Sequence, residues 1–242
     1  MAEFTDADMK GSRFWRVDLS GSRFHDVGLR DVKITDTFVH NVEISGAIGR
    51  LVVNEVDVSA FVREELDRRH PERKVLRAKD PDGLRAAWAM VAERADATLE
   101  RARALPAASL DVSVDEEWSY LQTLRHLVFA TDRWITGPVL GDPNPWHPLG
   151  VPPGDPKWGG AIGLDVDATP TVDEVLEVRR GRMASVAALL RDASSDDLAR
   201  VVVNPNGGST SVMSCVHVVL KEEWEHDRYA NRDLEQLERA GP

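Results

Sequence analysis

Cysteine is almost absent from this chain: Cys215 is the single one among 242 residues. One cysteine cannot form an intrachain disulfide, and such sparse use of cysteine is typical of proteins from reducing compartments, so we expect a cytoplasmic protein. The sequence also lacks an N-terminal basic-then-apolar signal and any stretch approaching the roughly 18 apolar residues that span a bilayer. We therefore expect no association with a membrane.

Basic residues are fewer than acidic ones, with 30 Lys and Arg against 41 Asp and Glu and a formal net charge of -11. A chain of this charge repels phosphate groups, which argues against nucleic acid as a partner. A hydrophobic content of 42% and a charged content of 29% are typical of a globular protein with enough apolar residues for a core. The length allows one large or two small domains.

A repeat of five residues organises the first fifty residues or so. Each repeat has an apolar central residue, and a small or β-branched residue stands two positions before it. The central residues are Phe4, Met9, Phe14, Leu19, Phe24, Leu29, Ile34, Val39 and Ile44. Neither a helix, with its period of 3.6, nor a strand, with its period of 2, produces a period of five. A square solenoid with one side per repeat does, and it would point the central side chains inward.

This pattern resembles the pentapeptide-repeat family. The resemblance implies a small right-handed quadrilateral β-helix over residues 1–56, with two to three coils. Stacked repeats need capped ends, and residues 57–79 are predicted to supply a capping helix, with Asp57 or Ser59 as its N-cap, and a linker. The repeat contains no cluster of catalytic residue types. We therefore expect a scaffold or an interaction surface. Its partner could be a second copy of the chain, in a homodimer, or another protein.

Four long helical patterns fill residues 80–242, and no strand signals separate them. We expect these helices at about residues 81–105, 114–136, 172–193 and 212–238. Their lengths and apolar stripes predict a mainly α fold, a four-helix bundle. Thr171 is the expected cap of the third helix, and Ser209 or Ser211 that of the fourth.

The connection over residues 137–170 is long and rich in proline and glycine. Connections of this length in compact domains are usually lids or binding loops, or else disordered. Because this one holds Trp146 and Trp158, we expect it to pack against the bundle and to cover a pocket in part.

Glu222 and His226 interrupt the apolar stripe of the last helix. Their spacing of four places both side chains on one helix face, and a buried carboxylate beside an imidazole is costly unless it is paired or bound to a metal. His126, in the apolar second helix, is the candidate third ligand. Glu223 rivals Glu222 for the same role, and His147 is an alternative ligand from the loop. The competing interpretation is an ion pair on a solvated helix.

Residues 80–242 resemble the DinB-like superfamily, which includes mycothiol-dependent maleylpyruvate isomerases and bacillithiol transferases. The strings Trp118–His126 and Glu222–Tyr229 carry the likeness. The resemblance implies a divalent metal, zinc or nickel, held by His126, Glu222 and His226. Many members have histidine at the position of Glu222, whereas the maleylpyruvate isomerase branch has glutamate. It also implies a metal-dependent thiol S-transferase or isomerase, with a low-molecular-weight thiol and a small electrophile as partners.

Three alternatives to this activity follow from the same residues. The chain could be a non-enzymatic metal- or ligand-binding protein whose repeat segment binds another protein. It could be a metal-dependent hydrolase, because a metal with an open coordination position also ionises water. The three side chains could also form only a hydrogen-bonded network, without a metal.

Overall fold

The structure is a computed structural model, and it describes residues 3–240 except 6, 26, 47, 155 and 156. The side chain of Trp158, expected to pack down, lies outside this description. In chain order the elements are β1 (Val52–Val53), β2 (Val56–Asp57), α1 (Ser59–Arg69), η1 (Pro71–Arg77), α2 (Pro81–Arg103), η2 (Ala107–Asp111), α3 (Tyr120–Thr131), η3 (Asp132–Thr136), α4 (Lys157–Ala161), α5 (Val172–Asp192), α6 (Ser195–Ala199), β3 (Val201–Val203), β4 (Ser209–Ser211) and α7 (Val212–Ala240).

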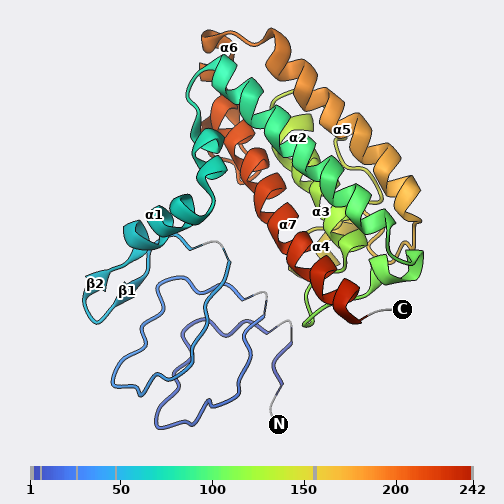
Figure 1. The fold of residues 1–242 in the computed structure, drawn as a ribbon. Coiled ribbons are helices and arrows are strands. Elements are labelled where there is room, and N and C mark those ends of the chain that lie inside the picture. Colours follow the sequence, from blue (N-terminus) through green and yellow to red (C-terminus); the bar gives the residue numbers. More distant parts are fainter. Residues whose placement is uncertain (1–2, 6, 26, 47, 155–156, 241–242) are drawn as a thin grey trace.

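The four long helices α2, α3, α5 and α7 form a bundle (Figure 1). α2 and α3 each pack against both α5 and α7, so α2 and α3 face each other diagonally across the core. Two apolar clusters fill this core, one around Leu84, Val216 and Trp224 and the other around Leu124 and Leu234. Between the clusters lies a layer of buried polar side chains, to which Arg179, Glu223 and His126 belong.

Local capping explains where the helices begin. Ser119 and Thr171 each accept a hydrogen bond from the backbone three residues on, while Gln122 and Glu174 complete capping boxes. The second bundle helix begins at Tyr120, later than expected, because Asp115 and Glu116 have positive φ angles that no α-helix contains. Among the described residues, no helix is long and apolar enough to cross a membrane.

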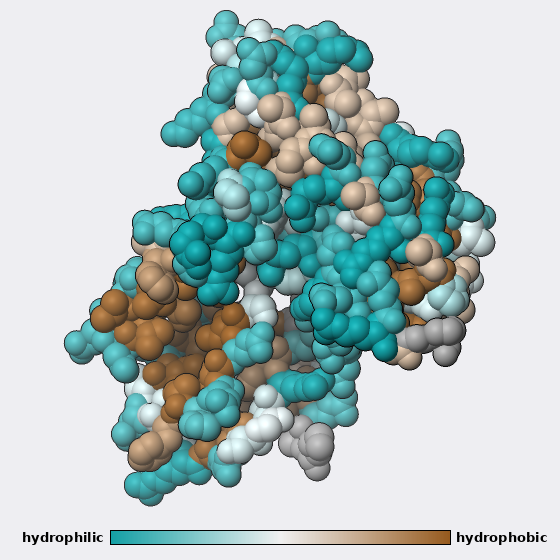
Figure 2. Space-filling view, in the orientation of Figure 1, coloured by the Kyte–Doolittle hydropathy of each residue, from teal (hydrophilic) through white to brown (hydrophobic). Residues whose placement is uncertain are grey.

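The N-terminal segment differs from the predicted β-helix. The backbone of residues 3–50 has positive φ angles in steps of five or ten residues, at Gly11, Arg16, Gly21, Asp31, Asp36, Asn41 and Gly46. The described part of this segment nevertheless contains no strand, and its apolar central side chains are exposed. Figure 2 shows hydrophobic surface gathered at the lower left, where Figure 1 places the segment. The expectation of a β-helix is therefore not met, since so few repeats offer little neighbouring surface on which to stack.

Two small hairpins also depart from the expectations. β3 and β4 pair antiparallel between α6 and α7, although no strand was predicted there. Three consecutive β-branched valines before an Asn-Pro-Asn-Gly-Gly turn explain this hairpin. β1 and β2 form a second hairpin, just before α1.

The N-cap expected for α1 is not observed, whereas one of the two expected for α7 is. The N-cap of α1 is Val58 and neither Asp57 nor Ser59, since the Ser59 hydroxyl instead accepts a hydrogen bond from the Leu51 amide. At α7 the Ser211 hydroxyl accepts a hydrogen bond from the Ser214 amide at 3.1 Å, as predicted.

Candidate metal centre

Three side chains from α3 and α7 converge at one point of the bundle. Glu222 Oε2 lies 3.4 Å from His126 Nε2 and 3.2 Å from His226 Nε2. One ligand atom from each of the three residues lies within 4.8 Å of the others. The structure thus brings together the three residues that the sequence singled out.

The hydrogen bonding of His126 indicates whether a cation fits between the three side chains. His126 Nδ1 lies 3.1 Å from the carbonyl oxygen of Val151, and because a carbonyl only accepts, Nδ1 carries the hydrogen. In the neutral ring, Nε2 then presents a lone pair to the Glu222 carboxylate, which is also an acceptor. Two ligand atoms each about 2.1 Å from a tetrahedral zinc ion lie about 3.4 Å apart. The donor types, and the distance of each histidine nitrogen from Glu222, therefore fit a divalent metal.

The surroundings favour the protonation states that such a metal requires. Burial lowers the pKa of His126, which keeps its imidazole neutral near pH 7. Burial acts to raise the pKa of Glu222, but the adjacent rings of His126 and His226 outweigh it and hold the pKa below its usual range. The site therefore combines neutral imidazole with an ionised carboxylate.

The two rival ligands are engaged elsewhere. Glu223 accepts two hydrogen bonds from Arg179 on α5, at 2.9 and 2.5 Å, and both side chains are buried. His147 Nδ1 accepts a hydrogen bond from the Leu149 amide at 3.2 Å. Adjacent residues on a helix point in different directions. Glu222 therefore lies at the candidate metal centre, whereas Glu223 lies in the core of the bundle.

The loop over residues 137–170 is fastened to α3 beside this centre. The buried Arg125 side chain donates hydrogen bonds of 2.7–2.9 Å to the carbonyl oxygens of Leu149, Asp165 and Ala168. The ring of Trp146 stacks on Phe129 at 5.4 Å. These contacts bring the Val151 carbonyl to His126. No local sequence pattern predicts this role for Arg125, because it depends on how the loop folds back.

Trp118 is a further residue at the site that the sequence did not identify. Its indole lies 4.6 Å from the His126 ring and stacks on the His226 ring at 6.0 Å, measured between ring centroids. Trp118 precedes the N-cap of α3, so helical periodicity does not predict where it points. It gives the centre an apolar side.

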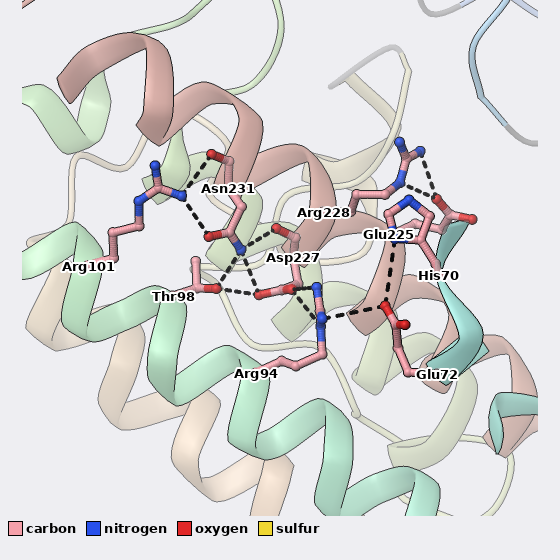
Figure 3. A network of polar contacts seen from close by, with 9 residues as sticks. All are labelled: His70, Glu72, Arg94, Thr98, Arg101, Glu225, Asp227, Arg228 and Asn231. Atoms are coloured by element: carbon pink, nitrogen blue, oxygen red, sulfur yellow. Dashed lines mark hydrogen bonds and ion pairs between the residues drawn. The ribbon is translucent and has the colours of Figure 1, made fainter. Parts of the chain in front are cut away.

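Asp227, beside His226 in the sequence, fixes the rotation of α7. Its carboxylate accepts a 2.5 Å hydrogen bond from Thr98 and forms an ion pair with Arg94 at 2.8 Å, both from α2 (Figure 3). Arg94 also lies 3.6 Å from Glu72 of η1. The network joins η1, α2 and α7, and it holds Asp227 against α2 while the ring of the neighbouring His226 lies beside that of His126 on α3.

The fold and the site together define a four-helix bundle with a candidate three-ligand centre between two of its helices. The sequence profile of the DinB superfamily matches residues 89–230, more than half of the chain, and the chain therefore belongs to the DinB superfamily. This confirms the predicted superfamily and leaves its branch unassigned, and the matched range excludes the N-terminal segment. Searches of curated proteins and of solved structures gave no match.

Proposed function

We propose that the chain is a metal-dependent thiol S-transferase or isomerase that uses a low-molecular-weight thiol and a small electrophile. The observation that carries the proposal is the convergence of His126, Glu222 and His226. Three protein ligands suit a catalytic centre, since structural zinc sites are usually closed by four. The preference for thiol chemistry rests on the resemblance to maleylpyruvate isomerases and bacillithiol transferases.

Each ligand residue has a defined part in this proposal. His126 offers its Nε2 lone pair because the Val151 carbonyl holds the hydrogen on Nδ1. Glu222 supplies the negative charge, and His226 completes the set from one turn further along α7. A divalent metal bound by them would act as a Lewis acid and stabilise a thiolate at neutral pH. The Trp118 indole shields one side of the centre from water, which strengthens electrostatic interactions there.

Metal analysis of purified variants tests the ligand set. We expect the wild-type protein to contain about one zinc or nickel ion per chain and His226→Ala to lose it, since two remaining ligands hold such ions weakly. His147→Ala is the control, because His147 lies outside the convergent set, and it should keep the metal. Retention of the metal by His226→Ala would show that the ligand set is wrong.

A second measurement separates the enzyme from a binding protein. The metal-loaded chain is incubated with mycothiol, bacillithiol or glutathione and a panel of electrophiles, and thiol consumption is followed. We expect consumption with at least one pair, and none after treatment with a chelator. Metal-loaded protein that consumes no thiol would favour the non-enzymatic interpretation.

A further inference from the structure

A cavity of about 290 Å³ lies between the helices of the bundle, and several residues of the second apolar cluster line it. All four long helices line it. Its rim is formed by exposed residues of α2 and α5, among them Asp96 and Arg180, and its inner wall includes His226. The cavity thus runs from the groove between α2 and α5 to a ligand residue of the candidate metal centre, which itself lies between α3 and α7.

The wall of this cavity is largely apolar, and its buried charges are paired. Leu99, Leu124 and Leu176 supply apolar surface. The guanidinium of Arg179 is bound by Glu223, and the Asp227 carboxylate is bound by Thr98 and by Arg94. A charged ligand would find no free countercharge among these pairs and would lose its hydration on entry. The buried part of the wall therefore suits an uncharged group, while exposed charged residues such as Asp96 and Arg103 lie at the rim.

Two hydroxyl groups on one face of α3 complete the wall. Tyr120 and Thr123 both line the cavity, and neither side-chain hydroxyl has a hydrogen-bond partner within the described part of the chain. Burial raises the pKa of Tyr120 to about 12, so its hydroxyl remains a donor at neutral pH. Neither hydroxyl oxygen is itself buried, so both are accessible from the cavity and can hydrogen-bond a bound group that accepts.

We propose that the cavity binds the apolar body of an uncharged carbonyl compound, whose oxygen accepts a hydrogen bond from Tyr120. The available volume corresponds to on the order of ten non-hydrogen atoms, given that a water molecule in the liquid occupies about 30 Å³. Assigning this ligand as the electrophile that reacts beside His226 rests on the proposed function. The binding site itself rests only on the cavity and its wall.

Binding is measured on the full chain by ligand-observed NMR, with metal bound and after chelation, so that no turnover is needed. Acetophenone is the probe, and ethylbenzene is the matched compound that lacks the carbonyl oxygen. We expect acetophenone to bind about 3- to 10-fold more tightly, which is the usual contribution of one neutral hydrogen bond. Tyr120→Phe should abolish this difference while leaving ethylbenzene binding unchanged.

A cavity-filling variant supplies the independent test. Ala95 lines the cavity from α2, and Ala95→Leu should weaken the binding of both probes about 10-fold or more, because overpacking a filled site is costly. Ala97→Leu makes the same change at an exposed position of the same helix and should leave binding as in the wild type. For an active enzyme, Ala95→Leu should also raise KM for carbonyl electrophiles more than it lowers kcat.

The outcomes separate this inference from the proposed function. Absence of acetophenone binding, or equal binding by wild type and Tyr120→Phe, would overturn the ligand site whatever the metal centre does. Binding that depends on Tyr120 in a protein that consumes no thiol would refute the proposed function and support the site as a ligand pocket.

Discussion

The N-terminal segment and the helical bundle both have regular apolar patterns, yet only the bundle buries them. In residues 3–50 the central side chains of Phe24 and Leu29 are 62% and 61% exposed, whereas Leu84 and Leu220 of the bundle are fully buried. The five-residue period coincides with regularly spaced positive φ angles, which are local properties of the backbone. Burial additionally needs a facing surface, and four amphipathic helices supply one to each other.

Ion pairs, like apolar side chains, include both buried and exposed examples in this structure. Arg179 and Glu223 form a buried pair between α5 and α7, while many other ion pairs, such as that of Arg180 with Glu177, are exposed to solvent. Removing one partner of a buried pair leaves an uncompensated charge in the core, and an exposed partner is simply hydrated. The contribution of an ion pair to stability therefore depends more on its burial than on the distance between its charged groups.

The largest effect is expected from Arg179→Met, which leaves the Glu223 carboxylate buried without its partner. The free energy of unfolding should fall by about 3–5 kcal/mol, as measured in urea. Arg180→Met, one residue further on in the same helix, should cost at most about 1 kcal/mol because its pair is exposed. Similar losses in the two variants would contradict a dry ion pair in the core.

Leucine-to-alanine changes in the two regions test the comparison directly. Leu220→Ala should lower the free energy of unfolding by about 2–5 kcal/mol through the lost apolar contacts and the resulting cavity. Leu29→Ala should change it by no more than about 0.5 kcal/mol, because the side chain is already solvated. A large loss in Leu29→Ala would show that the repeat segment buries its central residues in solution, as the predicted β-helix requires.

The smallest effect concerns the acid stability of α1, which links the two regions. Hydrogen bonds from Arg68 and Arg69 lower the pKa of Glu65 from 4.5 to about 2. A carboxyl group whose pKa is lowered by folding stabilises the native state above its unfolded pKa, and this contribution disappears as the pH falls from about 4.5 to about 2. Glu65→Gln should therefore flatten the decline of the urea midpoint between pH 6 and pH 3. Glu64→Gln, the same change one residue earlier, should leave the decline as in the wild type.

Much of the bundle and of the candidate centre could be predicted because the signals are local. The cap at Thr171 and the start of α2 at Pro81 follow from short sequence patterns, as does the shared helix face of Glu222 and His226. The strand at Val201–Val203 was missed, although its run of valines is a local signal, because the surrounding helical patterns were stronger.

Glu222 and His226 lie one helical turn apart, so the sequence by itself determined that they share a face; local backbone geometry fixes that relation. Only the tertiary structure decided that His126 meets them, that Glu223 turns instead to Arg179, and that a cavity with Tyr120 on its wall reaches His226. These relations depend on how α2, α3, α5 and α7 rotate and pack against one another. That packing is set by the sum of many long-range contacts, which no short stretch of sequence contains.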